Sequence, residues 1–325
     1  TREVNIAHSR VWKEVAGRNG WPRADYGVLV LKSRVEIQDS LIADIGDGYY
    51  YGDNYGLYAT NGSHVTLTGN TFTGNSNYAL YMAGSTLDSS GNVYSNTQQN
   101  AIYATGMQAI TVTNSTFVGN GGWALGVSVD SLDKLVQSGN TVSGNRINPL
   151  AISGGAMEGN LYLGEVALGE AAGYALGGDL VVPAGMKLTV GAGATILGDE
   201  GAELQVLGHL EAIGTDTQPI TFTSVLNTGP NQWSGLVFDG AGASGDLDHV
   251  TVQYGGTGNS ITGDQGSNIA IRDVITREVH IAHSRVWKEV AVRNGWPRAD
   301  YGVLVMNSRV EIQDSLIADI GDGYY

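Results

Sequence analysis

Aromatic and charged side chains gather in one short segment of this 325-residue chain, residues 12–27. Flat rings beside hydrogen-bonding groups can stack on sugars or form the centre of a protein–protein contact. The candidates are Trp12, Arg18, Trp21, Arg23, Asp25 and Tyr26, with Trp287, Trp296, Arg298 and Tyr301 in a second occurrence of the segment. Two interpretations stay open: the loop covers or contacts a neighbouring surface, or it binds a ligand.

Carboxylates and glycines alternate in residues 44–58, DIGDGYYYGDNYGLY. Asp44, Asp47 and Asp53 offer the oxygen ligands that calcium prefers, and the glycines allow the tight turns of a calcium loop. Their spacing matches neither the EF-hand loop nor the calcium-binding nonapeptide repeat. The pattern therefore favours a glycine-rich turn bearing tyrosines. We expect no cofactor, with calcium as the alternative.

No arrangement of residues in the sequence points to catalysis. His8, His64, His209 and His249 are scattered and show no metal-ligand spacing. The chain has no Cys, and it has no GxSxG nucleophile elbow. A polysaccharide lyase would need a basic residue near clustered carboxylates, and residues 51–275 contain only four Lys and Arg. We expect the chain not to be an enzyme.

A short recurring pattern must position these residues. Apolar and polar residues alternate, a Ser or Asn follows, and two or three more strand residues lead to a turn, as in VTLTGNTFTGN (65–75). The Ser/Asn positions recur every 22–31 residues, at Ser9, Ser40, Asn70, Asn92, Ser115 and Asn140. This spacing fits one coil of a β-solenoid whose apolar residues face inward and stack on the next coil. Since Asn tolerates a left-handed backbone and its amide bonds local backbone groups, we expect a corner with an internal ladder.

The segment NGSHVTLTGNTFTGNSNYALYM (61–82) and its copies resemble the right-handed parallel β-helix repeats of pectate-lyase-like folds and bacterial surface proteins. Residues 179–256, which include DLVVPAGMKLTVGAGATI and LDHVTVQYGG, resemble a second pattern from large secreted β-helix proteins. The resemblance implies an all-β, right-handed parallel β-helix located outside the cell or on its surface. It implies no single activity, because this fold hosts enzymes, adhesins and stalks.

Residues 1–50 return as residues 276–325 with only four differences: Asn5/His280, Gly17/Val292, Leu31/Met306 and Lys32/Asn307. A period of 275 residues predicts a tandem array, from which this chain would be a window. We expect one continuous solenoid of about eleven coils per repeat. Residues 1–155 would carry the Ser/Asn row, residues 156–275 the second style of coil, and residues 276–325 the start of the next repeat.

The net charge of −15 argues against nucleic acid as a partner. No apolar run approaches the ~20 residues that span a bilayer. The sequence favours an extracellular structural protein that forms a stiff stalk, adhesin shaft or filament, with copies of itself as partners along the array and laterally. One alternative is an adhesin whose Trp/Tyr loop holds surface glycans, and another is a polysaccharide lyase or hydrolase.

Overall fold

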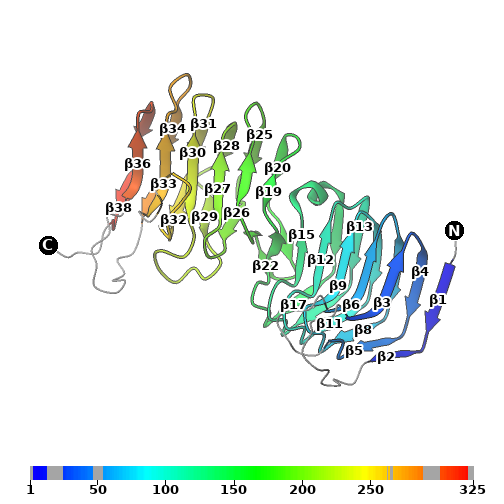
Figure 1. Cartoon of the computed structure of the whole chain (residues 1–325). Coiled ribbons are helices and arrows are strands. Elements are labelled where there is room, and N and C mark those ends of the chain that lie inside the picture. Colours follow the sequence, from blue (N-terminus) through cyan, green and yellow to red (C-terminus); the bar gives the residue numbers. More distant parts are fainter. Residues whose placement is uncertain are drawn as a thin grey trace. The chain divides into compact units, whose positions relative to one another are not determined.

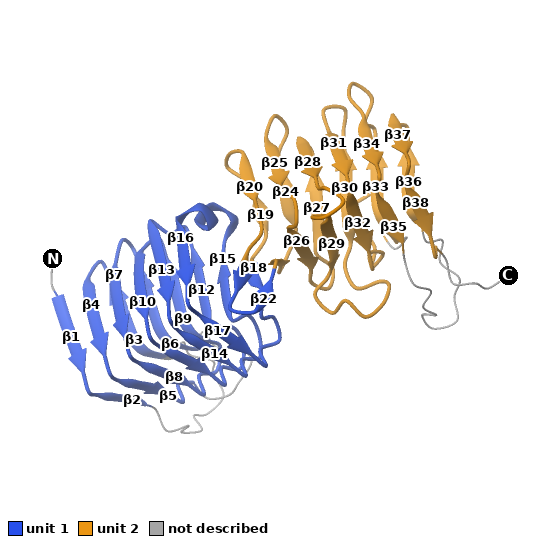
Figure 2. Cartoon of the chain, turned by 180° about the vertical axis from the view of Figure 1, so that it is seen from behind, with its two compact units in different colours: residues 1–151, 167–172 blue, residues 152–166, 173–325 orange. Residues whose placement is uncertain are grey.

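The computed structural model describes residues 3–12, 25–46, 54–261, 263, 266–287 and 301–320. The chain divides into two compact units (Figures 1 and 2): unit 1 is residues 1–151 with 167–172, and unit 2 is residues 152–166 with 173–325. Nearly all the regular structure is strand, and the described residues contain one helix, the 3-10 turn Val129–Lys134. The division between the units lies close to residue 155, where the sequence predicts a change of coil style.

Unit 1 is a stack of coils, and each described coil gives one strand to each of three parallel sheets. The first sheet contains β1 (Glu3–Ala7), β4 (Arg34–Gln38), β7 (His64–Thr68), β10 (Thr86–Ser90), β13 (Ala109–Thr113) and β16 (Leu135–Ser138). The second contains β2 (Arg10–Trp12), β5 (Leu41–Ala43), β8 (Thr71–Thr73), β11 (Val93–Ser95), β14 (Thr116–Val118) and β17 (Thr141–Ser143). The third contains β3 (Asp25–Leu31), β6 (Asn54–Thr60), β9 (Tyr78–Ala83), β12 (Ile102–Thr105), β15 (Leu125–Val127) and β18 (Leu150–Ile152). An antiparallel hairpin, β21 (Ala167–Leu168) with β22 (Ala171–Ala172), also belongs to this unit.

Unit 2 repeats the design with longer loops. One of its sheets contains β19 (Gly155–Ala156), β24 (Leu180–Val182), β27 (Glu203–Val206), β30 (Gly235–Asp239), β33 (Ser267–Arg272) and β36 (Tyr301–Met306). The next contains β20 (Leu161–Leu163), β25 (Lys187–Val190), β28 (His209–Ile213), β31 (Ser244–Asp248), β34 (Val279–Ala282) and β37 (Val310–Gln313). A third set contains β23 (Tyr174–Leu176), β26 (Thr195–Gly198), β29 (Ile220–Ser224), β32 (Val250–Gln253), β35 (Arg285–Trp287) and β38 (Leu316–Ala318). The parallel β-solenoid predicted from the sequence is confirmed in both units.

The core follows from alternation along each strand. In β7, Val65 and Leu67 have no exposed surface, while the residues between and beside them reach solvent. Phe72, Tyr94 and Phe117 stack one above another, with neighbouring ring centroids 5.1 Å apart and planes within 17°. That separation is close to the ~4.8 Å spacing of paired strands. Each coil therefore buries its apolar residues chiefly against the coils on either side.

One repeat contains fewer coils than the sequence indicates. Before β34, the second copy of β1, the corresponding strand occurs ten times among the described residues: β1, β4, β7, β10, β13, β16, β20, β25, β28 and β31. The expectation of about eleven coils is wrong because loops lengthen some coils of unit 2. His209 and its neighbour Ser244 on the next coil are 35 positions apart, outside the predicted 22–31 residues.

The left-handed corner residues also differ from the expectation. They stand one position before the Ser/Asn row, with φ between 46° and 66°: His8, Asp39, Gly69, Gly91, Asn114 and Gly139. All six are exposed. The turn is thus made by a residue that faces solvent, which leaves the following Ser or Asn to direct its side chain along the stack.

Candidate functional site

The Ser/Asn row is a hydrogen-bonded ladder along one corner of unit 1. In each step the backbone N–H of one member donates to the side-chain oxygen of the member on the next coil. The five steps are Ser9 N to Ser40 Oγ at 3.0 Å, Ser40 N to Asn70 Oδ1 at 2.9 Å, Asn70 N to Asn92 Oδ1 at 2.8 Å, Asn92 N to Ser115 Oγ at 3.2 Å and Ser115 N to Asn140 Oδ1 at 3.0 Å. Because the ladder occupies these side-chain oxygens in satisfying buried backbone donors, we assign it a structural role.

The other two corners of unit 1 carry similar bonds, which the sequence interpretation missed. At one corner the N–H of Ser63 donates to Ser85 Oγ at 3.2 Å, and that of Met107 to Ser131 Oγ at 2.9 Å. At the other, the N–H groups of Thr97 and Asn120 donate, each at 3.0 Å, to the next coil's amide oxygens, Asn120 Oδ1 and Asn145 Oδ1 respectively. These residues recur at the same 22–25 residue intervals, which is the signal that could have found them.

Only part of the predicted aromatic loop lies in the described structure. Arg18, Trp21, Arg23, Trp296 and Arg298, with the side chain of Asp25, fall outside the described residues. Trp12 ends β2 with 60% of its surface exposed, and Tyr26 in β3 is 39% exposed. Their second copies, Trp287 in β35 and Tyr301 in β36, are partly buried. Trp287 lies with its ring centroid 6.1 Å from that of Tyr254 on the preceding coil.

Tyr26 is the first member of a larger tyrosine surface on the third sheet of unit 1. The surface consists of Tyr26, Tyr55, Tyr58, Tyr78, Tyr81 and Tyr103. Tyr26 stacks on Tyr55 with centroids 5.6 Å apart, and Tyr55 on Tyr78 at 5.5 Å. A second pair, Tyr58 and Tyr81, stacks at 5.3 Å. Because these rings cover one another's faces, the arrangement is a stacked ladder more than an open platform for sugars.

A charged face lies on β25, β28 and β31 of unit 2. Lys187 Nζ is 2.9 Å from Glu211 Oε2, and Glu211 stands in register with Asp246 on the next coil. His209 Nε2 is 3.5 Å from Asp246 Oδ2. The hydrogen bond from Lys187 lowers the pKa of Glu211. The fold therefore brings a basic group beside carboxylates, a clustering that sequence reasoning could not assess.

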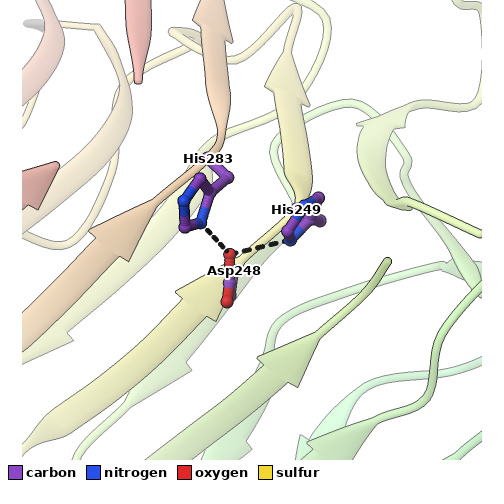
Figure 3. A group of neighbouring side chains, drawn as sticks. All are labelled: Asp248, His249 and His283. Atoms are coloured by element: carbon purple, nitrogen blue, oxygen red, sulfur yellow. Dashed lines mark hydrogen bonds and ion pairs between the residues drawn. The ribbon is translucent and has the colours of Figure 1, made fainter. Parts of the chain in front are cut away.

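The histidines are less scattered than their sequence positions suggest. His249 and His283, 34 residues apart, lie on adjacent coils on either side of Asp248 (Figure 3). His283 Nδ1 is 2.9 Å from Asp248 Oδ1 and His249 Nδ1 is 2.8 Å from the same oxygen. Hydrogen bonding to Asp248 raises the pKa of His283. The expectation of no ligand-like grouping is wrong here, because the coil length sets which residues meet. His64 instead lies 3.3 Å from Asp88, on the neighbouring strand.

The remaining candidates show little chemistry. Asp44 has a left-handed backbone with φ of 54°, and Asp47 and Asp53, the other calcium candidates, lie outside the described residues. A cavity of about 620 Å³ lies beside β16, β17 and the β21–β22 hairpin. Its lining residues offer one carboxylate, Glu170, and no basic group. Within the part of the chain that the structure describes, no helix is long and apolar enough to cross a membrane.

Comparison with known families covers both units. Residues 18–147 match the family described as "Right handed beta helix region". Residues 159–268 match "Pectate-lyase like beta helix domain". No curated protein and no solved structure matches the chain. The two matches agree with the stacked parallel strands seen in each unit.

Proposed function

Since the chain is a repeat protein of the right-handed, pectate-lyase-like parallel β-helix type, we propose that its role is structural. In this proposal 275-residue repeats stack coil on coil in tandem. The product is a stalk, adhesin shaft or filament at the cell surface or outside the cell, and its length scales with the number of repeats.

The duplicated segment carries this proposal, because both copies pair in one register. Val4 in β1 lies opposite Val35 in β4, and Val279 in β34 lies opposite Val310 in β37. The second copy also pairs backwards, with Val279 opposite Gly245 in β31. The same segment thus accepts a coil on either side, as an internal member of an array must.

Burial of the two copies supports the same conclusion. Val4 is 51% exposed, whereas its copy Val279, with β31 beside it, has no exposed surface. Ile312 and Ile317 are 42% and 43% exposed, whereas their copies Ile37 and Ile42, with β7 and β8 beyond them, are fully buried. Burying one such side chain stabilises by about 1.5–3 kcal/mol. Stacking repeat on repeat would bury all of these residues.

Electron microscopy of proteins with one, two and three repeats tests this proposal. We expect rods whose length increases by a constant increment per repeat, at most about 48 Å for ten coils of ~4.8 Å each. Variable increments, or beads joined by flexible connections, would contradict a continuous solenoid.

A second candidate function, polysaccharide cleavage, is favoured by the charged face around Lys187 and Glu211. It is also favoured by the pectate-lyase-like match of residues 159–268. The chain would then release reducing ends from acidic polysaccharides, and Lys187→Ala and Glu211→Gln would abolish that release. A purely structural protein releases none.

Glycan binding is the other alternative, and it rests on the exposed rings of Trp12 and Tyr26. A glycan array compares the wild-type chain with Trp12→Ala and Tyr26→Ala. Binding that both substitutions remove would support an adhesin. Binding that neither changes would exclude these two rings as the glycan site.

A further inference from the structure

We propose that Asp248, His249 and His283 bind one zinc ion, and that this site arises where one repeat meets the next. Asp248 ends β31, His249 follows it at the corner before β32, and His283 occupies the matching corner between β34 and β35. The proposal goes beyond the structural role and does not depend on it, because all three residues lie in the described part of one chain.

The corner geometry brings the three ligands together. His249 and His283 both have a left-handed backbone, with φ of 51° and 46°. Their rings stack with centroids 4.9 Å apart and planes 22° from parallel, which matches the spacing of adjacent coils. Each ring turns its Nδ1 toward Asp248 Oδ1 (Figure 3), and the three donor atoms all lie within 4.8 Å of one another.

This donor set suits zinc better than calcium. Imidazole nitrogens favour zinc, copper and nickel, whereas calcium takes oxygen ligands. Zinc binds His nitrogen and carboxylate oxygen at about 2.0–2.2 Å, and many sites use three protein ligands with water as the fourth. The three atoms here need only small side-chain rotations to surround one ion.

A second carboxylate stands behind each ring. His249 Nε2 lies 3.0 Å from Asp216 Oδ1, and His283 Nε2 lies 3.9 Å from Asp314 Oδ2. A carboxylate that accepts the Nε2–H of a histidine holds the tautomer whose Nδ1 lone pair can bind metal. His249 Nδ1 is shielded from solvent and has no hydrogen-bond partner among the described residues. It is therefore directed at Asp248 without being engaged as a donor.

The site combines the end of one repeat with the start of the next. His283 and Asp314 belong to the second copy of the duplicated segment, while Asp248 and His249 belong to the coil before it. In the first copy, His8 lies 4.0 Å from Asp39, and the described residues place no counterpart of Asp248 or His249 beside it. A zinc ion would thus join the two coils at the junction and stabilise the folded state by binding it selectively.

Isothermal titration of the whole, untagged chain with zinc chloride tests the site. We expect one zinc per chain and an increase in Tm when zinc is added. His283→Asn should weaken binding by roughly 100-fold or more, since loss of even an outer-shell partner costs about 10- to 100-fold. Asparagine is chosen because it already occupies left-handed positions such as Asn61 and Asn114, so the corner should be retained.

His8→Asn is the matched control, because it makes the same change in the first copy of the same sequence. It should bind zinc as the wild-type chain does. Absence of zinc binding by the wild-type chain would overturn the proposal, and so would equal binding by His283→Asn and Asp248→Ala. Circular dichroism of each variant establishes that it is folded. Displacement of zinc by equimolar calcium would contradict the histidine ligands.

Discussion

At the scale of single residues, Asn92 shows how the corners are held. Its side chain is buried and makes bonds in three directions. Oδ1 accepts from the N–H of Asn70 at 2.8 Å, while Nδ2 donates to the carbonyl of Leu67 at 2.9 Å and to Ser89 Oγ at 3.0 Å. One amide thus satisfies backbone groups of the preceding coil and joins it to its own.

Asn92→Ala should lower the free energy of unfolding of unit 1 by about 2–4 kcal/mol. The reason is that the N–H of Asn70 and the carbonyl of Leu67 would be left buried without partners, at about 1–3 kcal/mol each. Urea unfolding followed by circular dichroism measures the loss.

Asn92→Ser is the control for that measurement. Ser40 and Ser115 hold the same place on other coils and accept from the coil before through Oγ. The serine variant should therefore lose less stability than the alanine variant. Equal losses would show that the ladder bond to Asn70 contributes little.

The sequence predicted one corner ladder and not the others, for a physical reason. The row through Asn70 and Asn92 follows directly on strongly alternating strands, so its register is visible in the sequence. The zinc-ligand candidates could not be found this way, because neighbouring coils vary from 22 residues, as between Val65 and Leu87, to 35, as between His209 and Ser244. Without the structure, no rule pairs His283 with Asp248.

At the scale of elements, ion pairs between adjacent strands add pH dependence. Lys187 in β25 and Glu211 in β28 pair across one coil step, and the hydrogen bond from Lys187 lowers the pKa of Glu211 below its ordinary value of 4.5. A carboxyl whose folded pKa is depressed stabilises the fold above its unfolded pKa, and this contribution is lost as the pH falls through the folded pKa.

Glu211→Gln should therefore reduce the loss of stability of unit 2 as the pH falls below about 4.5. The difference should be less than about 1 kcal/mol, because both side chains are more than one-third exposed. Urea unfolding at a series of pH values measures it. Glu158→Gln, at an exposed position of the same unit, should leave the profile unchanged. A Glu211→Gln profile identical to that of the wild-type chain would show that the pair is fully screened.

The strands themselves were predictable because alternation has one physical solution in each coil. In β7 and β13 the apolar residues Val65, Leu67, Ile110 and Val112 must face inward if the coils stack. The tyrosine surface was missed because Tyr58 and Tyr81 face outward, where the apolar pattern gives no signal. Their 23-residue interval, equal to one coil, marks the stack only once the sheet is known.

At the scale of the whole molecule, the duplication supplies matched pairs of identical residues in different surroundings. Ile37→Ala should destabilise unit 1 by about 2–5 kcal/mol, the usual cost of emptying a packed site. Ile312→Ala makes the same change in the second copy, where the residue is 42% exposed. It should cost about 1 kcal/mol or less.

The measurement for this pair is urea unfolding of each variant, followed in the unit that contains the substitution. A large difference would show that the neighbouring coil, and not the local sequence, makes this segment stable. Similar costs at the two positions would show that the second copy is already supported without a coil beyond it.

Hydrogen–deuterium exchange tests continuous stacking of repeats most directly. The present chain is compared with one in which a second copy of residues 51–275 follows Tyr325. Strands β37 and β38 have unpaired backbone groups at their outer edge among the described residues, whereas their copies β4 and β5 pair on both sides. In the present chain, residues 310–318 should thus exchange faster than residues 35–43. In the longer chain the two segments should exchange equally slowly. Fast exchange of residues 310–318 in both chains would contradict stacking of one repeat on the next.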